Sequence, residues 1–371
     1  MHDDEPIPLV DLAAQHREIA DEVHAAFDQI LARTAYIGGP DVGAFEREFA
    51  AYCGLPQCVG VANGTDAIEL GLRAAGLERG DEVILPANTF IATAEAVERA
   101  GGTVVLVDCD PVHLLLEPKA IEERLSGRTR AVIGVDLFGQ LAPFELIRDA
   151  VRGRDVFVAE DAAQSQGATR HGRPIGHGVR FASTSFYPGK NLGAYGDGGA
   201  VLTDDVELAQ TVRALGSHGG LRKYEHLHVG CNSRLDTLQA AVLRAKLRRL
   251  NGWNERRGVL AARYSELLRN VPGVELPTVD PANTAVWHLF VVRVAERDNV
   301  LAQLHDAKIG AGIHYPVPVH LTAAFAHLGH GPGDFPVAEA AAASMISLPL
   351  HAHLSDAQQD RVVATLTAAL R

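Results

Sequence analysis

Two polar residues follow consecutive strand-like segments, at places where active sites are commonly built. Lys190 lies in a glycine-rich turn after the β-type run FASTSFYP, and Asp161 comes late in the apolar run DVFVAED. A lysine amine forms a Schiff base with an aldehyde, and an aspartate beside a pyridine nitrogen keeps the ring protonated as an electron sink. A lone lysine here would be interpreted as a surface residue. The pair instead predicts a site for pyridoxal 5′-phosphate (PLP), with Lys190 and Asp161 as its catalytic residues.

The phosphate of such a cofactor needs hydrogen-bond donors at the same edge of the sheet. Residues 63–66 read NGTD and open a helical pattern. The amides of this turn, including that of Gly64, and the hydroxyl of Thr65 are suited to hold a phosphate at a helix N-terminus. Ser185, in the strand-like run before Lys190, is a further candidate. Taken singly, an ordinary helix N-cap and an outward-facing serine are simpler interpretations.

Phe90 and Gln164 complete the candidate cofactor set. Phe90 follows the run EVILPANT and is suited to stack on a cofactor ring, although a core aromatic is an equal alternative. Gln164 lies about one helical turn after Asp161, so it would face the same side and reach a ring hydroxyl. Because all these residues follow strand-like runs, together they favour one common site.

Short β-rich runs alternate with helical patterns through most of the chain. This alternation predicts an α/β fold with a mainly parallel seven-stranded sheet and helices on both of its faces. The last two runs are joined by the Lys190 turn without a helix, so one antiparallel strand is expected. The predicted strands cover residues 58–63, 82–86, 103–110, 131–139, 156–162, 181–187 and 199–205.

The pattern changes in the last third of the chain. A long amphipathic stretch with a helical stripe of apolar residues runs over residues 235–269. After it we expect a smaller α/β domain, so that the chain divides into residues 1–245, the PLP-binding domain, and residues 246–371. Its predicted elements are strands at 284–294 and 309–316, a helix at 299–308 and a terminal helix at 354–370 with an N-cap near Ser355.

The composition is that of a globular protein, since 47% of the 371 residues are hydrophobic and 22% are charged. The net charge of −12 argues against nucleic-acid binding, and apolar runs broken by charges argue against a membrane span. The four cysteines form no CxxC pair, so no metal site or disulfide framework is expected. The N-terminus MHDDEPIP is unlike a signal peptide. These features predict a cytoplasmic protein.

Several longer motifs occur together: NGTDAI, PANTFIATAEA, EDAAQSQGA, SFYPGKNLGAYGDGG, GCNSRLDTLQAA and HYPVPVH. As a set they resemble the DegT/DnrJ/StrS-type family of PLP-dependent nucleotide-sugar aminotransferases, over nearly the whole chain. The resemblance implies the aspartate-aminotransferase fold, also called PLP fold type I. It also implies a homodimer whose active sites are shared between the subunits.

The resemblance implies a role for each matched residue. Lys190 is similar to the Schiff-base lysine and Asp161 to the partner of the pyridinium nitrogen. Gln164 matches the residue at the ring hydroxyl, and Phe90 matches the ring stacker. The matched phosphate ligands are Gly64, Thr65, Ser185 and Asn232, the last donated by the neighbouring subunit. The matched substrate contacts are Arg234, His314 and Tyr315.

The implied reaction moves an amino group from L-glutamate to a nucleotide-linked keto sugar through one shared site, with ping-pong kinetics. The NGTDAI turn and the VDLAAQ start resemble the branch that acts on 3-keto sugars. A dTDP-3-keto-6-deoxyhexose is therefore the favoured substrate, and its amino product would serve a glycosylated natural product or a surface glycan. A dTDP-4-keto sugar and a UDP-3-keto sugar are the alternatives.

A non-catalytic nucleotide-binding or regulatory protein of the same fold is the alternative from another class. The glycines of the Lys190 turn follow the lysine, and no G-x-x-x-x-G-K-[ST] motif is present. A non-catalytic member would be expected to lose Lys190 or Asp161, and both residues are here.

Two features concern charge near the substrate. Similar sequences usually read VHLYGQ where this chain has VDLFGQ, so Asp136 is expected to add a negative charge near the crevice, altering substrate contacts or pairing with an arginine. Arg222, Lys223 and Arg234 are the candidate cations for a diphosphate.

Overall fold

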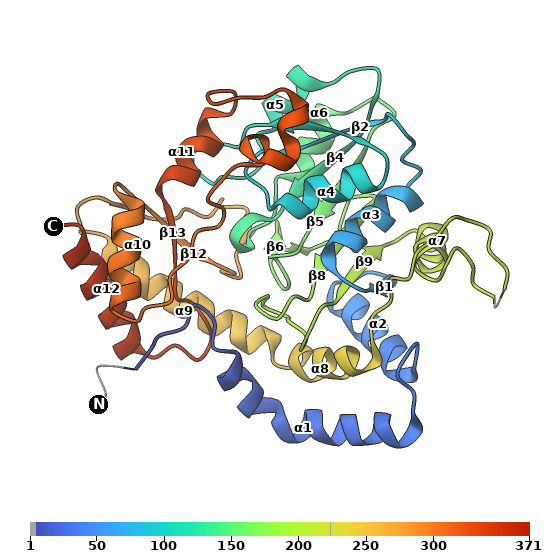
Figure 1. The fold of residues 1–371 in the computed structure, drawn as a ribbon, viewed down its shortest axis with the longest axis horizontal. Coiled ribbons are helices and arrows are strands. Elements are labelled where there is room, and N and C mark those ends of the chain that lie inside the picture. Colours follow the sequence, from blue (N-terminus) through green and yellow to red (C-terminus); the bar gives the residue numbers. More distant parts are fainter. Residues whose placement is uncertain (1–4, 223) are drawn as a thin grey trace.

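Seven strands form the central sheet of the computed structural model, which describes residues 5–222 and 224–371. They are β1 (Gln57–Val61), β2 (Glu82–Pro86), β3 (Thr103–Val107), β4 (Thr129–Val135), β5 (Phe157–Asp161), β8 (Phe181–Ser185) and β9 (Gly199–Thr203). Their order is β1-β9-β8-β5-β4-β2-β3 (Figure 1). β9 is antiparallel to both of its neighbours, and the other pairs are parallel. The predicted sheet, with one antiparallel strand, is confirmed.

Helices connect and cover these strands. The helices of this part are α1 (Leu12–Arg33), α2 (Pro40–Tyr52), α3 (Gly64–Ala74), α4 (Ile91–Arg99), α5 (Pro118–Arg124), α6 (Phe144–Ala150), α7 (Val206–Gly216) and α8 (Thr237–Leu247), with a 3₁₀ turn at Leu137–Gly139. α1 lies along α8, below the sheet in Figure 1. Among the described residues, none of the helices has the length and apolar character needed to cross a lipid bilayer.

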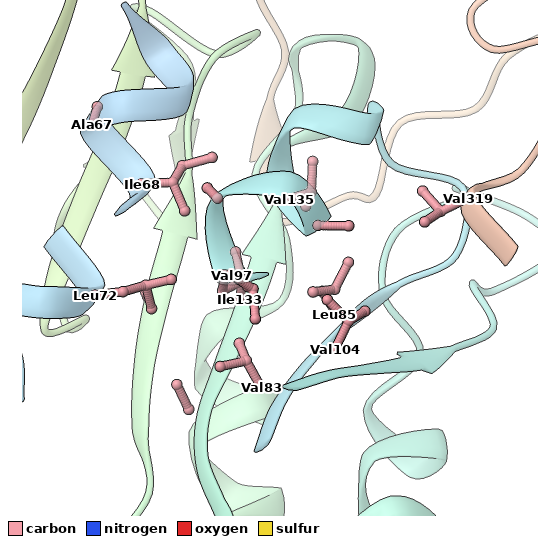
Figure 2. Close-up of a cluster of buried hydrophobic side chains, with 14 of the residues drawn as sticks. Ala67, Ile68, Leu72, Val83, Leu85, Val97, Val104, Ile133, Val135 and Val319 are labelled. Atoms are coloured by element: carbon pink, nitrogen blue, oxygen red, sulfur yellow. The ribbon is translucent and has the colours of Figure 1, made fainter. Parts of the chain in front are cut away.

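The core has two layers because successive side chains of a strand point to opposite faces of the sheet. On one face, Val83 and Leu85 of β2 lie with Ile133 of β4 and with side chains of α3 and α4 (Figure 2). On the other face, Ile84 of β2 lies with Phe45 of α2 and side chains of α6. The buried sheet is thus a fixed platform for the residues at the ends of its strands.

A smaller antiparallel sheet lies in the C-terminal third of the chain. Its strands are β10 (Val274–Glu275), β12 (Phe290–Val294) and β13 (Met345–Leu348), in the order β10-β12-β13. The surrounding helices are α9 (Leu250–Leu268), α10 (Arg297–Asp306), α11 (Pro336–Ser344) and α12 (Asp356–Ala369), with 3₁₀ turns at Val319–Leu321 and Ala323–Leu328. Ile7, from the N-terminal segment, is buried in the same core. The division of the chain at residue 245 stays a prediction.

A third, short sheet joins a hairpin of the large sheet region to a later segment. Its strands are β6 (Thr169–Arg170), β7 (Arg173–Pro174) and β11 (Asn283–Thr284), in the order β11-β6-β7. The hairpin thereby connects the chain after β5 to the segment that leads into β12.

The amphipathic stretch at residues 235–269 forms two helices, since α8 ends at Leu247 and α9 begins at Leu250. Leu243 packs in the core under the large sheet, whereas Leu260 packs in the C-terminal core, so the chain has to turn between them.

The strand predicted at residues 309–316 was wrong. The segment forms only isolated bridges at Ile309 and Gly312, because its glycines and Pro316 do not favour a regular ladder. The terminal helix is confirmed. Ser355 caps α12 in a reciprocal capping box with Gln358.

Candidate active site

A cavity of about 660 Å³ lies where the strands of the large sheet end. This is the edge at which an open α/β sheet binds its ligands. The predicted residues that line the cavity are Gly64, Thr65, Phe90, Asp161, Gln164, Ser185, Lys190, His314 and Tyr315. The fold therefore brings together residues that lie up to about 250 positions apart in the sequence, from Gly64 to Tyr315.

Lys190 reaches the cavity from the turn between β8 and β9. Its backbone amide donates to the carbonyl of Tyr187 (2.9 Å), which closes the turn. The side chain is half-buried in the cavity wall. Burial lowers the pKa of the Lys190 amine to about 8, and the negative charge of Asp161 opposes this shift. Near neutral pH a useful share of the amine is therefore uncharged and nucleophilic.

Asp161 is the last residue of β5 and is almost fully buried. The Thr93 hydroxyl donates to its Oδ2 (2.8 Å), and the Ala163 amide donates to its Oδ1 (3.2 Å). Burial raises the pKa of the Asp161 carboxyl, and these hydrogen bonds and the charge of Lys190 oppose the rise. A buried carboxylate held by neutral donors favours a cationic ligand such as a protonated pyridine ring.

The N-terminus of α3 lies directly against the end of β8. Asn63 caps the helix, because its side chain accepts from the amide of Asp66 (2.8 Å). A Cβ atom added to Gly64 would lie 2.6 Å from Cβ of Ser185, so only glycine allows this approach. Free helix amides therefore lie beside the hydroxyls of Thr65 and Ser185. This arrangement fits the phosphate of PLP.

Hydrogen bonds around Gln164 connect another part of the cavity lining. Its Oε1 accepts from the amide of Phe138 (2.6 Å), which leaves Nε2 to donate to the hydroxyl of Tyr315 (3.1 Å). The rings of Phe90 and Tyr315 lie 4.9 Å apart between centroids. Nδ1 of His314 hydrogen-bonds Oγ of Ser347 (2.8 Å). Burial and the nearby Lys190 lower the pKa of His314 to about 4, so its ring is neutral.

The candidate cations and the partner-subunit ligand lie away from this cavity. Asn232 is exposed and Arg234 is half-buried, and neither lines the cavity of its own chain. Arg222 is exposed and pairs weakly with Glu225 (4.0 Å). Lys223 lies outside the described residues. The roles of these side chains stay predictions.

The sequence did not indicate two further polar residues of the site, Thr93 and His288. Thr93 lies on α4 and is fully buried against Asp161. His288 lines the cavity just before β12. Thr93 occurs in a helical pattern and His288 in a strand pattern, and neither pattern indicates a site residue. Both side chains reach the site only through the tertiary fold.

The prediction that Asp136 alters substrate contacts or pairs with an arginine near the crevice was wrong. Its carboxyl is completely buried and accepts from Oγ of Ser165 (2.6 Å) and the amide of Ala142 (2.9 Å). Its side chain also lies within hydrogen-bonding distance of Glu160. The amide of Gly176 donates to Oε2 of Glu160 (2.6 Å), while Oε1 has no donor among the described residues. We interpret Oε1 as carrying a proton that it shares with Asp136.

This carboxyl pair predicts a falling stability as the pH rises. Burial raises the pKa of Asp136 to about 7, and burial together with Asp136 raises the pKa of Glu160. Between about pH 4 and pH 7 the folded pair therefore binds more protons than the same two residues in the unfolded chain, so its contribution to the free energy of unfolding decreases with pH. Asp136→Asn removes this contribution, so it is expected to raise Tm at pH 8 relative to Tm at pH 5 by about 2 °C or more, compared with wild type.

Thermal unfolding of both proteins at several pH values measures this difference. The matched control is Asp149→Asn, which removes the same charge from an exposed side chain and should leave the pH dependence unchanged. An equal pH dependence in wild type and Asp136→Asn would contradict the shared proton.

Comparisons with known proteins agree with this architecture. The model of the DegT/DnrJ/EryC1/StrS aminotransferase family matches residues 17–367. Erythromycin biosynthesis sensory transduction protein EryC1 of Saccharopolyspora erythraea is 46% identical over 98% of this chain and 99% of its own. The dTDP-3-amino-3,4,6-trideoxy-α-D-glucose transaminase of Streptomyces venezuelae is 44% identical over 96% of this chain and 94% of its own. The crystal structure of S. venezuelae DesV in complex with a ketimine intermediate has a TM-score of 0.96 at 44% identity, and the match covers 99% of each chain.

The fold and the comparisons are those of a PLP-dependent aminotransferase with the type I fold. The chain belongs to the DegT/DnrJ/EryC1/StrS aminotransferase family. The predictions of family, fold class, enzyme class and PLP cofactor are thereby confirmed. The roles of the individual site residues stay predictions.

Proposed function

We propose that this aminotransferase transfers the amino group of L-glutamate to C3 of a nucleotide-linked keto-deoxysugar, with a dTDP-3-keto-6-deoxyhexose as the substrate. The observation that carries the proposal is the single cavity that contains Lys190, Asp161 and the N-terminus of α3. The S. venezuelae relative, named as a dTDP-3-amino sugar transaminase, supports the choice of sugar class. The amino product would serve a glycosylated natural product or a surface glycan.

Lys190 is proposed to bind the aldehyde carbon of the cofactor and, once released, to carry a proton between the donor α-carbon and that carbon. When bound, PLP supplies an electron sink for the charge left by the removed proton. The lowered pKa of Lys190, about 8, suits both tasks, because the amine can be neutral before it accepts the proton and charged afterwards.

Asp161 is proposed to hold the proton on the pyridine nitrogen. The hydroxyl of Thr93 donates its proton to the Asp161 carboxylate and so holds it in place. Because that proton is already donated, the Thr93 oxygen accepts from the hydroxyl of Thr89, with 2.7 Å between the two oxygens. The cationic ring would offset the cost of burying the carboxylate. The acid therefore stays ionised, although burial alone would raise its pKa.

The remaining cavity residues are proposed to position the cofactor. Gly64, Thr65 and Ser185 would hold the phosphate, as the glycine-only approach of α3 to β8 supports. Phe90 would cover the ring, and Gln164 would contact the ring hydroxyl. Tyr315 and His314 line the same cavity and are proposed to contact the sugar nucleotide.

We also propose a cytoplasmic homodimer in which Asn232 of one subunit completes the phosphate site of the other and Arg234 contacts the substrate beside it. Both residues lie outside the cavity of their own chain, as a donated ligand would. The segment before them exposes apolar side chains at Leu221, Leu227 and Val229. The four cysteines are free, in keeping with a reducing compartment.

The choice of sugar carbon predicts a clear preference between two isomeric substrates. The enzyme is expected to convert dTDP-3-keto-6-deoxyhexose at least about 100-fold faster, in kcat/KM, than dTDP-4-keto-6-deoxyhexose, because a misplaced carbonyl loses its alignment with the reacting atoms. The measurement is the rate of 2-oxoglutarate release from L-glutamate with each sugar, with the product identified by mass spectrometry and NMR.

UDP-3-keto sugars test the nucleotide in the same assay. Amino transfer to the 4-keto isomer alone would contradict C3 amination, and a preference for the UDP-linked sugar would contradict the proposed nucleotide. No transfer to any keto sugar, with a functional cofactor, would contradict the sugar substrate class.

A further inference from the structure

His288 is buried in the wall of the cavity that Lys190 also lines. Its Nδ1 lies 3.1 Å from Oδ1 of Asn191, the residue that directly follows Lys190. The direction of this hydrogen bond determines which ring nitrogen of His288 carries the proton.

The side-chain amide of Asn191 has only one possible orientation. Its Nδ2 lies 3.0 Å from the carbonyl of Val286 and 2.9 Å from Oδ1 of Asn254. A backbone carbonyl can only accept, so the atom of Asn191 that faces Val286 has to be the NH₂ group. The orientation of Asn254 is consistent, because its own Nδ2 donates to the carbonyl of Gln166 (2.9 Å).

Oδ1 of Asn191 is therefore an acceptor, and Nδ1 of His288 has to donate to it. Burial, the positive charge of Lys190 and that of Arg257 lower the pKa of His288 well below its usual value, so the ring is neutral and carries one proton. That proton is on Nδ1. Nε2 is left with a bare lone pair, which the hydrogen bond to Asn191 does not use.

We infer that Nε2 of His288 accepts a hydrogen bond from the side-chain amine of Lys190 and holds that amine in place while it is free of the cofactor. The inference rests on the proposed function, in which Lys190 has to leave the cofactor and return to it. Of the charged groups that act on His288, Lys190 has the largest effect. His288 is thus a positioning residue for the lysine.

The other titratable groups around this contact are Asp161, His314, Asp197 and Arg257. Asp161 attracts the lysine amine, but in the loaded enzyme its carboxylate is proposed to pair with the pyridinium ring. His314 is neutral and uses Nδ1 on Ser347. His288 then supplies the acceptor that keeps the freed amine from turning away.

Two substitutions separate this role from a merely structural one. His288→Gln keeps a polar acceptor at the position of Nε2 and loses the donor to Asn191. His288→Asn keeps a donor at the position of Nδ1 and loses the acceptor that we infer for Lys190. The inference therefore predicts a loss in the Asn variant and a rescue in the Gln variant.

The readout is the pKa of the Lys190 amine, obtained from the pH dependence of its labelling by an amine-specific reagent and peptide mass spectrometry. The full-length enzyme is used in its pyridoxamine phosphate form, in which the lysine is free, and again without cofactor. His288→Asn is expected to lower this pKa by about one unit, because the acceptor stabilises the ammonium form. Labelling at pH 7 then becomes several-fold faster, while His288→Gln stays near wild type.

An unchanged pKa in folded His288→Asn, or a shift in His288→Gln but not in His288→Asn, would overturn the inference. If the variants do not fold, the protonation of His288 can be measured in the wild-type enzyme by NMR. The ¹⁵N chemical shifts of His288 should show a protonated Nδ1 and a bare Nε2, and a protonated Nε2 would overturn the inference as well. The cofactor-free series and the ¹⁵N shifts do not depend on the cofactor, so they stay interpretable if PLP is not attached to Lys190.

Discussion

Lys190→Ala is expected to lower kcat for amino transfer by about 10⁴-fold or more, because the covalent link to the cofactor and the proton carrier are lost together. Steady-state kinetics with L-glutamate and the keto sugar measure the loss. The variant should still bind PLP noncovalently, since the proposed phosphate site at Gly64 and Ser185 and the ring partner Asp161 remain. An added primary amine should restore part of the proton transfer.

Lys246 provides the matched control. It is also buried, and burial lowers its pKa to about 8, as for Lys190. Its amine donates to Oε1 of Gln15 (3.1 Å) and lies over the ring of Tyr195, outside the cavity. Lys246→Met should keep kcat within a few-fold of wild type. Comparable losses in the two variants would mean that a buried lysine matters for folding and not for the chemistry.

Asp161→Asn is expected to lower kcat by about 10³-fold, the scale associated with removing one preorganised electrostatic group from a reaction site. The amide has nearly the same shape but carries no charge, so the pyridine nitrogen would lose its proton and the ring its strength as an electron sink. Single-turnover formation of 2-oxoglutarate from L-glutamate measures this step without the sugar substrate.

Thr93→Val separates the charge of Asp161 from its placement. It removes the hydrogen bond to Oδ2 and keeps the carboxylate, so a loss of about 10- to 100-fold is expected, the value of one hydrogen bond to a charged group. Wild-type rates in Asp161→Asn would rule out the proposed role of the charge. Equal losses in both variants would assign the effect to local packing.

The parts of the site that the sequence predicted are those at strand ends. Asp161 ends β5 and Lys190 follows β8, and hydrophobic periodicity locates the end of a buried strand. The NGTD turn was predicted as well, because a helix N-terminus that follows a strand has a strong local sequence signature. These residues converge because the strands that carry them lie in one sheet.

The parts that the sequence did not predict depend on contacts between distant segments. His288 reaches the cavity because the chain before β12 packs on Gly139, where an added Cβ would lie 2.7 Å from the His288 amide. Asp136 turned away from the cavity because Ser165 and Ala142 offer its carboxyl two donors in the interior. Neither contact follows from a local pattern of residues.

The most direct test of the account is to reduce the purified enzyme with borohydride and to locate the modified peptide by mass spectrometry. Enzyme isolated in the pyridoxamine form has first to be converted with 2-oxoglutarate. The expected result is a phosphopyridoxyl group on Lys190, and none on Lys246. An unmodified Lys190 in enzyme supplied with PLP, or the group on another lysine, would contradict the proposed active site.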